Sequence, residues 1–307
     1  MKVLLTGASG FLGKYVLRAL QRQDIPAVAL GRTRPHGLAP ASFIAADLLT
    51  TDDFPALTRA AGATHLLHLA WVTEHGSYWN SALNFRWVDA TTRLVQAFCA
   101  SGGAHVVVAG TCAEYEWSQG RCHENETPLI PATLYGVAKD ASRRLVVALC
   151  ASYGARCAWG RVFFPFGVGE AAQRLVPALV AALLGQSAPF GVSAQARRDF
   201  LYAGDVADGL LALLQSDTSG GINISSGTPT PIAEIVCLLG QLLNKDPQVV
   251  LALPAQRADD VALLFGENSR LKALGWRQQF TLERGLEQML HDLSVRTQDT
   301  RGGVHGA

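Results

Sequence analysis

A glycine-rich segment near the start of the chain restricts the possible folds more than any other feature of the sequence. Val3–Thr6 is a short apolar run that leads into Gly-Ala-Ser-Gly-Phe-Leu-Gly, and apolar side chains then recur at helical spacing over residues 11–21. In this strand–turn–helix context the first glycine allows a tight turn, the second lets the backbone approach a pyrophosphate, and the third permits close packing of helix on strand. Free N–H groups at the helix N-terminus attract phosphate.

The segment therefore predicts a dinucleotide-binding turn. Its spacing is GxxGxxG rather than the GxGxxG of the standard fingerprint, and an ordinary glycine-rich turn is the alternative interpretation. The residues predicted to contact the dinucleotide here are Gly7, Ser9, Gly10, Phe11, Leu12 and Gly13.

Short apolar runs alternate with stretches of helical spacing through the first half of the chain. Strands are predicted over residues 3–6, 27–30, 43–46, 65–70, 105–109 and 155–163, and helices over 11–21, 52–61, 79–101 and 134–153. This order implies right-handed crossovers and a parallel sheet covered on both faces. The predicted fold class is therefore α/β, a Rossmann-type doubly wound parallel sheet with a smaller C-terminal substrate-binding domain.

The pattern loosens after Pro165, where glycines and prolines interrupt shorter elements. We predict a dinucleotide-binding domain over residues 1–165, with a returning segment near 200–225 that adds one more strand. A mainly substrate-binding domain is predicted over 166–292. Residues 293–307 are polar and rich in glycine, and a disordered tail is predicted there.

The composition argues against several classes of protein. Hydrophobic residues make up 49% of the 307 residues and charged residues 17%, the opposite of a disordered chain. The net charge is +1 without a basic stripe, so no nucleic-acid partner is expected. The six cysteines form no CxxC or Cys/His metal spacing, which predicts reduced thiols and no metal. No signal peptide or membrane-spanning run is recognised, so we predict a cytoplasmic protein without a membrane partner.

Two arginines follow the second predicted strand, in the sequence Gly31-Arg32-Thr33-Arg34. At this place an acidic residue would accept hydrogen bonds from the ribose 2′-hydroxyl of NAD, whereas an arginine suits the 2′-phosphate of NADP. No acid is present, so Arg32 favours NADP, with NAD as the other possibility. A solvated loop without cofactor contact is the structural alternative.

Tyr135 and Lys139 lie four residues apart, on one face of a predicted helix. A phenol with an ordinary pKa of about 10 is a poor proton shuttle at neutral pH, and a nearby cation favours its ionised form. The tyrosine could then exchange a proton with a carbonyl or alcohol oxygen while hydride moves to or from a nicotinamide. Thr111 ends the strand predicted near 105–109, where a hydroxyl faces the ligand crevice and can bind the substrate oxygen. A surface pair and a β-branched strand end are the structural alternatives.

With these motifs in place, the sequence resembles the extended short-chain dehydrogenase/reductase family over about residues 1–290, in particular its nucleotide-sugar epimerases, dehydratases and reductases. The resemblance implies that Thr111, Tyr135 and Lys139 are catalytic and that the tyrosine and lysine also contact the cofactor. The further cofactor contacts that it implies are Asp47 and Leu48 beside the adenine, Leu69 and Ala70 in the segment of the fourth predicted strand, and Asn84.

Arginines in the second half of the chain carry the resemblance to nucleotide-sugar enzymes. Arg198 in RDFLY and Arg257 in RADD match motifs whose arginines approach the substrate diphosphate, and Arg174 is a weaker candidate. A planar guanidinium binds two phosphate oxygens at once, which suits this ligand. Ion pairs of Arg198 with Asp199 or Asp205 are the structural alternative.

Departures from the family pattern bear on the reaction. Cys112 and Ala113 stand where dehydratases carry an Asp-Glu pair, so dehydration is not expected, and Phe164 replaces a hydrogen-bonding asparagine. The favoured prediction is an NADPH-dependent reductase of a 4-keto-6-deoxy nucleotide sugar, with Tyr135 as general acid. The alternatives are a nucleotide-sugar 4-epimerase with tightly bound NAD and a non-catalytic dinucleotide-binding regulator. The resemblance also implies a homodimer formed through the helices predicted over 79–101 and 134–153.

Overall fold

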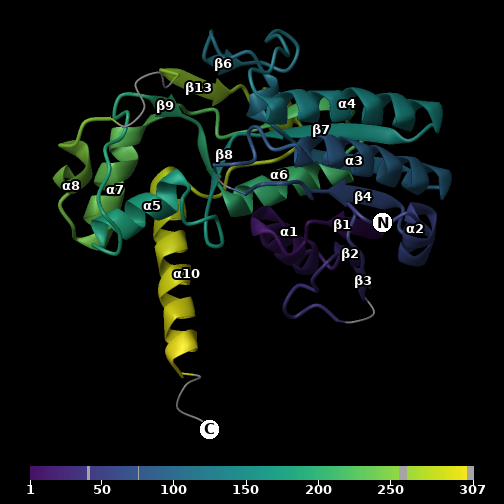
Figure 1. The fold of residues 1–307 in the computed structure, drawn as a ribbon, viewed down its shortest axis with the longest axis horizontal. Coiled ribbons are helices and arrows are strands. Elements are labelled where there is room, and N and C mark those ends of the chain that lie inside the picture. Colours follow the sequence, from purple (N-terminus) through teal and green to yellow (C-terminus); the bar gives the residue numbers. More distant parts are fainter. Residues whose placement is uncertain (40–41, 75, 256–260, 303–307) are drawn as a thin grey trace.

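A seven-stranded parallel sheet forms the centre of the computed structural model, which describes residues 1–39, 42–74, 76–255 and 261–302 (Figure 1). The strands run in the order β11-β7-β5-β4-β1-β2-β3, and every pairing in this sheet is parallel. Their bounds are β1 Val3–Thr6, β2 Ala27–Gly31, β3 Phe43–Ala45, β4 His65–His68, β5 His105–Thr111, β7 Arg156–Val162 and β11 Gly220–Ile224. The predicted doubly wound α/β fold is confirmed, and the strand order reverses between β1 and β4, where such sheets bind ligands.

Helices cover both faces of the sheet (Figure 1). Their bounds are α1 Phe11–Arg22, α2 Phe54–Ala61, α3 Leu83–Ala100, α4 Leu134–Ser152 and α6 Ala203–Gln215. Side chains alternate along a strand, so Val3 and Leu5 join the apolar core under α1 and α6, whereas Leu4 joins the core under α2, α3 and α4. Burial on both faces explains why the central strands are continuous apolar runs in the sequence.

A smaller unit lies beside the carboxyl ends of the central strands, on the left in Figure 1. Its helices are α5 Leu175–Leu183, α7 Ile232–Leu243, α8 Gln248–Leu251 and α10 Leu282–Gly302, whereas α9 Ser269–Ala273 packs against β11 and α6 of the main unit. Its short strands are β6 Arg121–Cys122, β8 Phe164–Phe166, β9 Arg197–Arg198, β10 Phe200–Tyr202, β12 Thr230–Pro231 and β13 Leu263–Gly266. The chain passes back to the main sheet through α6 and β11, near the returning segment proposed from the sequence.

The helix predicted from residue 79 begins at Leu83 instead. The side chain of Asn84 explains the difference, because its amide donates to the carbonyl oxygens of Tyr78 (2.7 Å) and Ser81 (2.9 Å). These bonds hold residues 78–81 as a turn that precedes the helix.

The C-terminal helix α10 continues to Gly302 through part of the segment for which we expected no regular structure. Apolar side chains continue at helical spacing, with Leu286 and Met289 buried and Leu290 and Leu293 packed against the core. Residues 303–307 lie outside the described residues.

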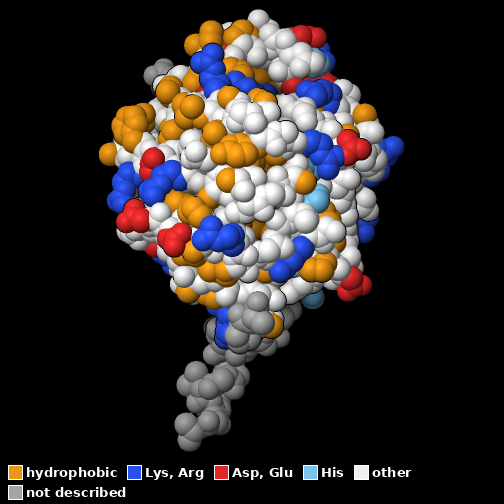
Figure 2. Space-filling model, turned by 90° about the vertical axis from the view of Figure 1, so that its right-hand side faces the viewer, with side chains coloured by type: hydrophobic (Ala, Val, Ile, Leu, Met, Phe, Trp, Pro, Cys, Tyr) orange, Lys and Arg blue, Asp and Glu red, His pale blue; other side chains and the backbone are white. Residues whose placement is uncertain are grey.

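The surface mixes charges of both signs. Figure 2 shows acidic, basic and apolar side chains interspersed on one face of the molecule. Within the described ranges, no helix combines the length and the apolar character needed to cross a membrane.

Candidate active site

The glycine-rich turn joins β1 to α1 and leaves no room for side chains at two positions. Gly7 has a φ of +71°, and a Cβ there would lie 2.8 Å from the backbone nitrogen of Ala70. At Gly13 a Cβ would overlap the carbonyl oxygen of Gly7. Gly10 is the N-cap of α1 and offers no side-chain acceptor to the first turn. The N–H groups of that turn therefore suit an external anion such as a pyrophosphate.

A buried chain of hydrogen bonds supports this turn from the sheet. Thr6 Oγ1 lies 2.7 Å from His68 Nδ1, and His68 Nε2 lies 3.0 Å from Thr91 Oγ1. The N–H of Ala70 donates to Thr6 Oγ1 over 3.3 Å. Burial and the nearby charge of Lys139 lower the pKa of His68 to about 3, so the imidazole is a neutral structural link.

Thr111 is fixed at the end of β5 by the short 3₁₀ helix η2 (Cys112–Glu114). Its hydroxyl accepts from the Ala113 N–H over 3.2 Å, and its own N–H donates to Glu114 Oε1 over 2.9 Å. This reciprocal arrangement is a capping box, which holds the hydroxyl at the carboxyl edge of the sheet.

Glu114 is completely buried, and both of its oxygens are engaged inside the protein. Oε2 accepts from Arg161 Nε over 2.8 Å, and Oε1 accepts from Trp159 Nε1 over 2.8 Å. Arg161 also donates to the Tyr115 hydroxyl (2.9 Å), which in turn donates to Asn223 Oδ1 (2.8 Å). Because this network occupies the carboxylate, Glu114 supports the site and is not placed to act as an acid on a ligand.

Tyr135 lies in the first turn of α4, beside Thr111. Gly136 makes this close packing possible, since a Cβ there would overlap the carbonyl oxygen of Ala113. The backbone N–H of Tyr135 donates to the carbonyl oxygen of Trp79 over 3.0 Å. Burial raises the pKa of the Tyr135 phenol, and its hydrogen bond with Thr111 acts in the opposite direction. The structure thus brings the two hydroxyls together.

Lys139 lies one helical turn further along α4 and is 4% exposed. Its Nζ donates to the carbonyl oxygen of Ala109 over 2.9 Å and lies 4.0 Å from the centre of the Trp71 ring system. Burial lowers the pKa of Lys139 to about 7, against the opposing effect of the Glu114 charge. The ammonium group is therefore close to its titration point at neutral pH.

The other residues proposed from the sequence to bind the cofactor differ in their exposure and in their hydrogen bonds within the protein. Arg32 is exposed just after β2, and Leu48 is buried. Asp47 accepts from the Leu49 N–H over 3.0 Å. Asn84 is fully buried; besides the two bonds to the turn, its Oδ1 accepts from Trp71 Nε1 over 2.9 Å. The Asn84 side chain is thus engaged within the protein.

The arginines proposed for a diphosphate occupy different places. Arg174, at the N-cap of α5, donates to Glu170 Oε1 and to the Tyr78 hydroxyl, each over 3.3 Å. Arg198 is 6% exposed and donates to the carbonyl oxygens of Arg197 and Val261. Arg257 lies outside the described residues.

The two acids weighed as ion-pair partners of Arg198 bind backbone instead. Asp199 accepts from the N–H groups of Ser226 (2.7 Å), Gly227 (3.1 Å) and Gly266 (3.1 Å). Asp205 accepts from the backbone N–H groups of residues 279 and 280. Burial raises the pKa of both carboxyl groups to about 6.

Three aromatic residues at the site were not identified from the sequence. Trp71 covers Lys139, and the Tyr78 and Trp79 rings meet the Tyr135 ring edge-on at centroid distances of 5.0 and 5.6 Å. Trp71 directly follows Leu69-Ala70. Its position just past a central strand could therefore have indicated that it lies at the ligand-binding edge. The other two depend on the 78–81 turn, which the sequence pattern did not reveal.

A cavity of about 310 Å³ lies beside η2 and the N-terminus of α4. The residues that line it include Ala113, Tyr115, Trp117, Ile130, Thr133 and Val261. Thr133 is also the N-cap of α4, where its hydroxyl accepts from the Gly136 N–H over 3.1 Å. The cavity therefore adjoins the segment that carries Tyr135.

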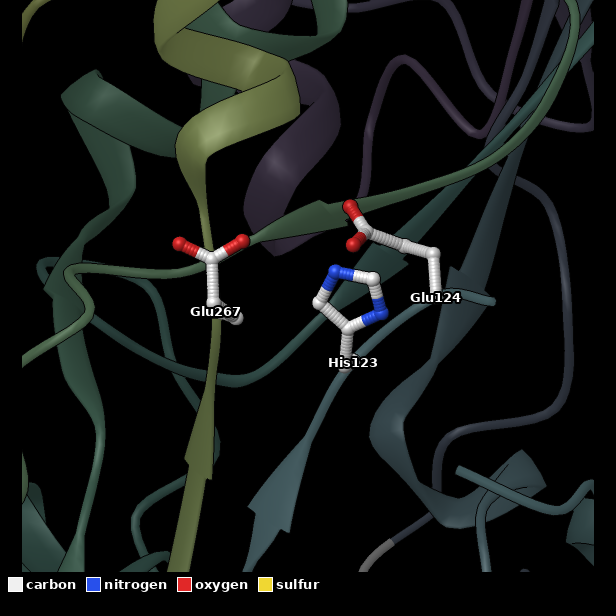
Figure 3. Close-up of side chains that lie close together, drawn as sticks. All are labelled: His123, Glu124 and Glu267. Carbon is white, nitrogen blue, oxygen red and sulfur yellow. The ribbon is translucent and has the colours of Figure 1, made fainter. Parts of the chain in front are cut away.

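A separate cluster of ligand-type side chains lies where β6 meets β13. One ligand atom from each of His123, Glu124 and Glu267 lies within 4.8 Å of the others, and Figure 3 shows both carboxylates turned toward one side of the imidazole. Glu124 Oε1 already accepts from the Asn223 N–H, and both Glu267 oxygens accept from Ser269. The carboxylates thus bind the protein itself, although their chemistry would also suit a divalent cation.

The amino-acid sequence of residues 3–225 matches the model of the NAD dependent epimerase/dehydratase family. The chain belongs to this family. The resemblance inferred from the motifs is confirmed, and the matched relatives are named as nucleotide-sugar epimerases, dehydratases and reductases.

Individual relatives of the family are distant but match along nearly the whole chain. The trifunctional UDP-glucose 4,6-dehydratase/UDP-4-keto-6-deoxy-D-glucose 3,5-epimerase/UDP-4-keto-L-rhamnose-reductase RHM1 of Arabidopsis thaliana is 24% identical, over 99% of this chain and 48% of its own length. This chain thus spans about half of that relative. The UDP-glucose 4-epimerase of Azospirillum brasilense is 24% identical, over 94% of this chain and 93% of its own. The structure of MoeE5 in complex with UDP-glucuronic acid and NAD is similar with a TM-score of 0.83 and 25% identity, over 97% of this chain and 100% of that chain.

Proposed function

We propose that the protein is a nicotinamide-dependent oxidoreductase that acts at carbon 4 of the sugar in a nucleotide sugar. The observation that carries the proposal is the grouping of Thr111, Tyr135 and buried Lys139 at the carboxyl edge of the sheet. The glycine turn lies at the same edge and fits a dinucleotide, because its backbone is bare of side chains where the phosphates would bind.

Each residue of the site has a distinct role in the proposed reaction. The bound nicotinamide supplies the chemistry of hydride transfer. Tyr135 moves the proton at the C4 oxygen, and the Thr111 hydroxyl orients that oxygen by a hydrogen bond. A positive charge on Lys139, one helical turn away, would favour the ionised phenol. The hydrogen bond with Thr111 also opposes the effect of burial on the pKa of Tyr135. Of the arginines that the structure describes, Arg174 and Arg198 are the candidates for binding the diphosphate.

Two specific reactions use these residues, and 4-epimerisation with retained NAD is the first candidate. The epimerase of Azospirillum brasilense matches over almost its full length, and MoeE5 is named with both a UDP-sugar and NAD. Reduction of a 4-keto-6-deoxy nucleotide sugar by NADPH is the second candidate. It is favoured by exposed Arg32 and Arg34 after β2, where no acid stands to bind a ribose 2′-hydroxyl.

Identification of the cofactor separates the two reactions. Purified protein would be denatured, and the released nucleotide would be identified by mass spectrometry. We expect NAD at close to one equivalent, together with interconversion of C4 epimers of a UDP-sugar followed by NMR without net oxidation. Protein that is purified without nucleotide and that oxidises NADPH in the presence of a 4-keto sugar would overturn epimerisation in favour of reduction.

A Tyr135→Phe variant tests the chemistry common to both reactions. Loss of the hydroxyl should lower kcat by at least ~10²-fold, because proton transfer by a positioned group contributes this much or more. Dinucleotide affinity, measured by calorimetric titration of protein stripped of bound nucleotide, should be unchanged. A variant that keeps its biological activity while lacking turnover would instead support a non-catalytic dinucleotide-binding regulator.

A further inference from the structure

Lys139 keeps its position in an apolar site without an ion-pair partner among the described residues. Its ammonium contacts the Ala109 carbonyl oxygen at 2.9 Å and the face of Trp71 at 4.0 Å from the ring centre. A cation over an indole face is attracted by the ring quadrupole, and the attraction is strongest where water is excluded. Lys139 is 4% exposed and Trp71 8%, so water is excluded here.

Trp71 cannot easily turn its face away from Lys139. Its Nε1 donates to Asn84 Oδ1 over 2.9 Å, and its ring stacks on Trp87 with centroids 6.1 Å apart and planes inclined by 26°. Asn84 is itself fixed by its two bonds to the turn that precedes α3. The hydrogen bond at its edge therefore fixes the orientation of the indole, and Trp87 packs against the ring.

We propose that Trp71 is a positioning residue, oriented by Asn84, that holds the Lys139 side chain in its charged, site-facing form. The inference rests on the proposed role of Lys139 in the reaction. It also gives Asn84 an indirect role, through Trp71, in place of the direct cofactor contact that the family resemblance implies.

The other titratable groups that face Lys139 do not replace the indole. The charge of Glu114, from η2, favours the ammonium form of Lys139. Its carboxylate is nevertheless bound by Arg161, Trp159 and the Thr111 N–H, so it does not take the place of the indole in contact with the lysine. His68, from β4, is neutral.

Two further titratable groups lie on the same helix as Lys139. Tyr135 is a phenol whose pKa is raised by burial, and Asp140 is paired with Arg143 at 2.7 Å. Burial already lowers the pKa of Lys139 to about 7, so a further loss of attraction would move its titration below neutral pH and decrease the charged fraction.

The direction of the pH effect follows from which form of Lys139 is active. The charged form is required, so activity and dinucleotide binding should fall as pH rises through the pKa of this lysine. Replacing Trp71 by leucine removes the π face, disfavours the cation and should move that alkaline limb down by about one pH unit. Trp71→Phe keeps an aromatic face and should move it less.

The test measures kcat/KM for the substrate and, on protein stripped of bound nucleotide, the calorimetric Kd of the dinucleotide. Both are measured between about pH 5.5 and about pH 9, a range that spans the lowered pKa of Lys139. The variants are Trp71→Leu, Trp71→Phe and the matched control Trp87→Leu, which removes an indole from the same stack but leaves the face over Lys139. Relative to wild type, we expect the alkaline limb to shift most in Trp71→Leu, less in Trp71→Phe and not at all in Trp87→Leu. Equal limbs in wild type and Trp71→Leu, or an equal shift in Trp87→Leu, would overturn the proposal.

The phenylalanine variant and the Kd profile allow a decision where the leucine variant or the turnover assay gives none. If Trp71→Leu does not fold, Trp71→Phe still decides, because an unmoved limb in a folded phenylalanine variant together with unchanged affinity at high pH contradicts the proposal. The Kd profile is independent of turnover. It therefore tests the Trp71–Lys139 coupling even if no nucleotide sugar is converted, an outcome that would contradict the proposed function alone.

Discussion

At the scale of single residues, the buried ion pair of Glu114 and Arg161 is the feature of the site whose loss should cost the most stability. Their side chains are 0% and 2% exposed, and the carboxylate also fixes the Thr111 backbone. Removing one member of a buried pair leaves the other charge without compensation in an apolar region. The edge of the sheet that carries Thr111 therefore depends on a buried charge whose hydrogen-bond partners lie within the protein.

Replacing Glu114 by alanine should destabilise the fold by about 3–5 kcal/mol, because the Arg161 guanidinium would remain buried and unpaired. Urea unfolding followed by circular dichroism measures this difference. Glu126→Ala is the control, since the Glu126 side chain is 75% exposed and its loss should change stability by at most about 0.5 kcal/mol. A similar small effect for both variants would show that Arg161 finds another partner.

At the scale of elements, the contact of α1 with β1 depends on the absence of a side chain at Gly13. A Gly13→Ala substitution should lower the melting temperature by several degrees, because overpacking against backbone costs about 1–3 kcal/mol. It should also weaken dinucleotide binding by displacing the turn. Gly31→Ala, where a Cβ would meet nothing within 4 Å, is the matched control and should leave the melting temperature unchanged. Equal melting temperatures and equal affinities in both variants would contradict this view of the turn.

The elements that were predictable from the sequence are those specified locally. The central strands are continuous apolar runs, and the glycine turn is recognised by its spacing and its position between a strand and a helix. The fold and its ligand-binding edge can therefore be predicted from the sequence. The hydrogen bonds of the Asn84 side chain could not be predicted from the sequence, because its partners lie in a turn where the pattern predicted a helix. The closeness of Glu124 and Glu267 depends on the pairing of β6 with β13, which no local pattern specifies.

At the scale of the whole molecule, the homodimer implied by the family resemblance stays a prediction. The structure offers a surface that fits it, since α3 and α4 pack side by side over one face of the sheet. Phe85 on α3 is 64% exposed, and Val137 and Leu145 on α4 are 48% and 46% exposed. Large apolar side chains on neighbouring helices are typical of an interface that a two-fold axis pairs with itself.

A charge placed on this surface should separate the subunits. We expect the wild-type protein to have twice the chain mass of 32.7 kDa in light scattering, and Leu145→Glu to shift the mass toward that of one chain. Val249→Glu is the matched control, because Val249 lies on α8 in the smaller unit and is exposed to a similar extent, 43%. Since Leu145 lies more than one turn beyond Lys139 on α4, dissociation with retained dinucleotide affinity would place the interface apart from the site. A wild-type mass of one chain would refute the dimer, whereas dissociation by Val249→Glu alone would move the interface to the smaller unit.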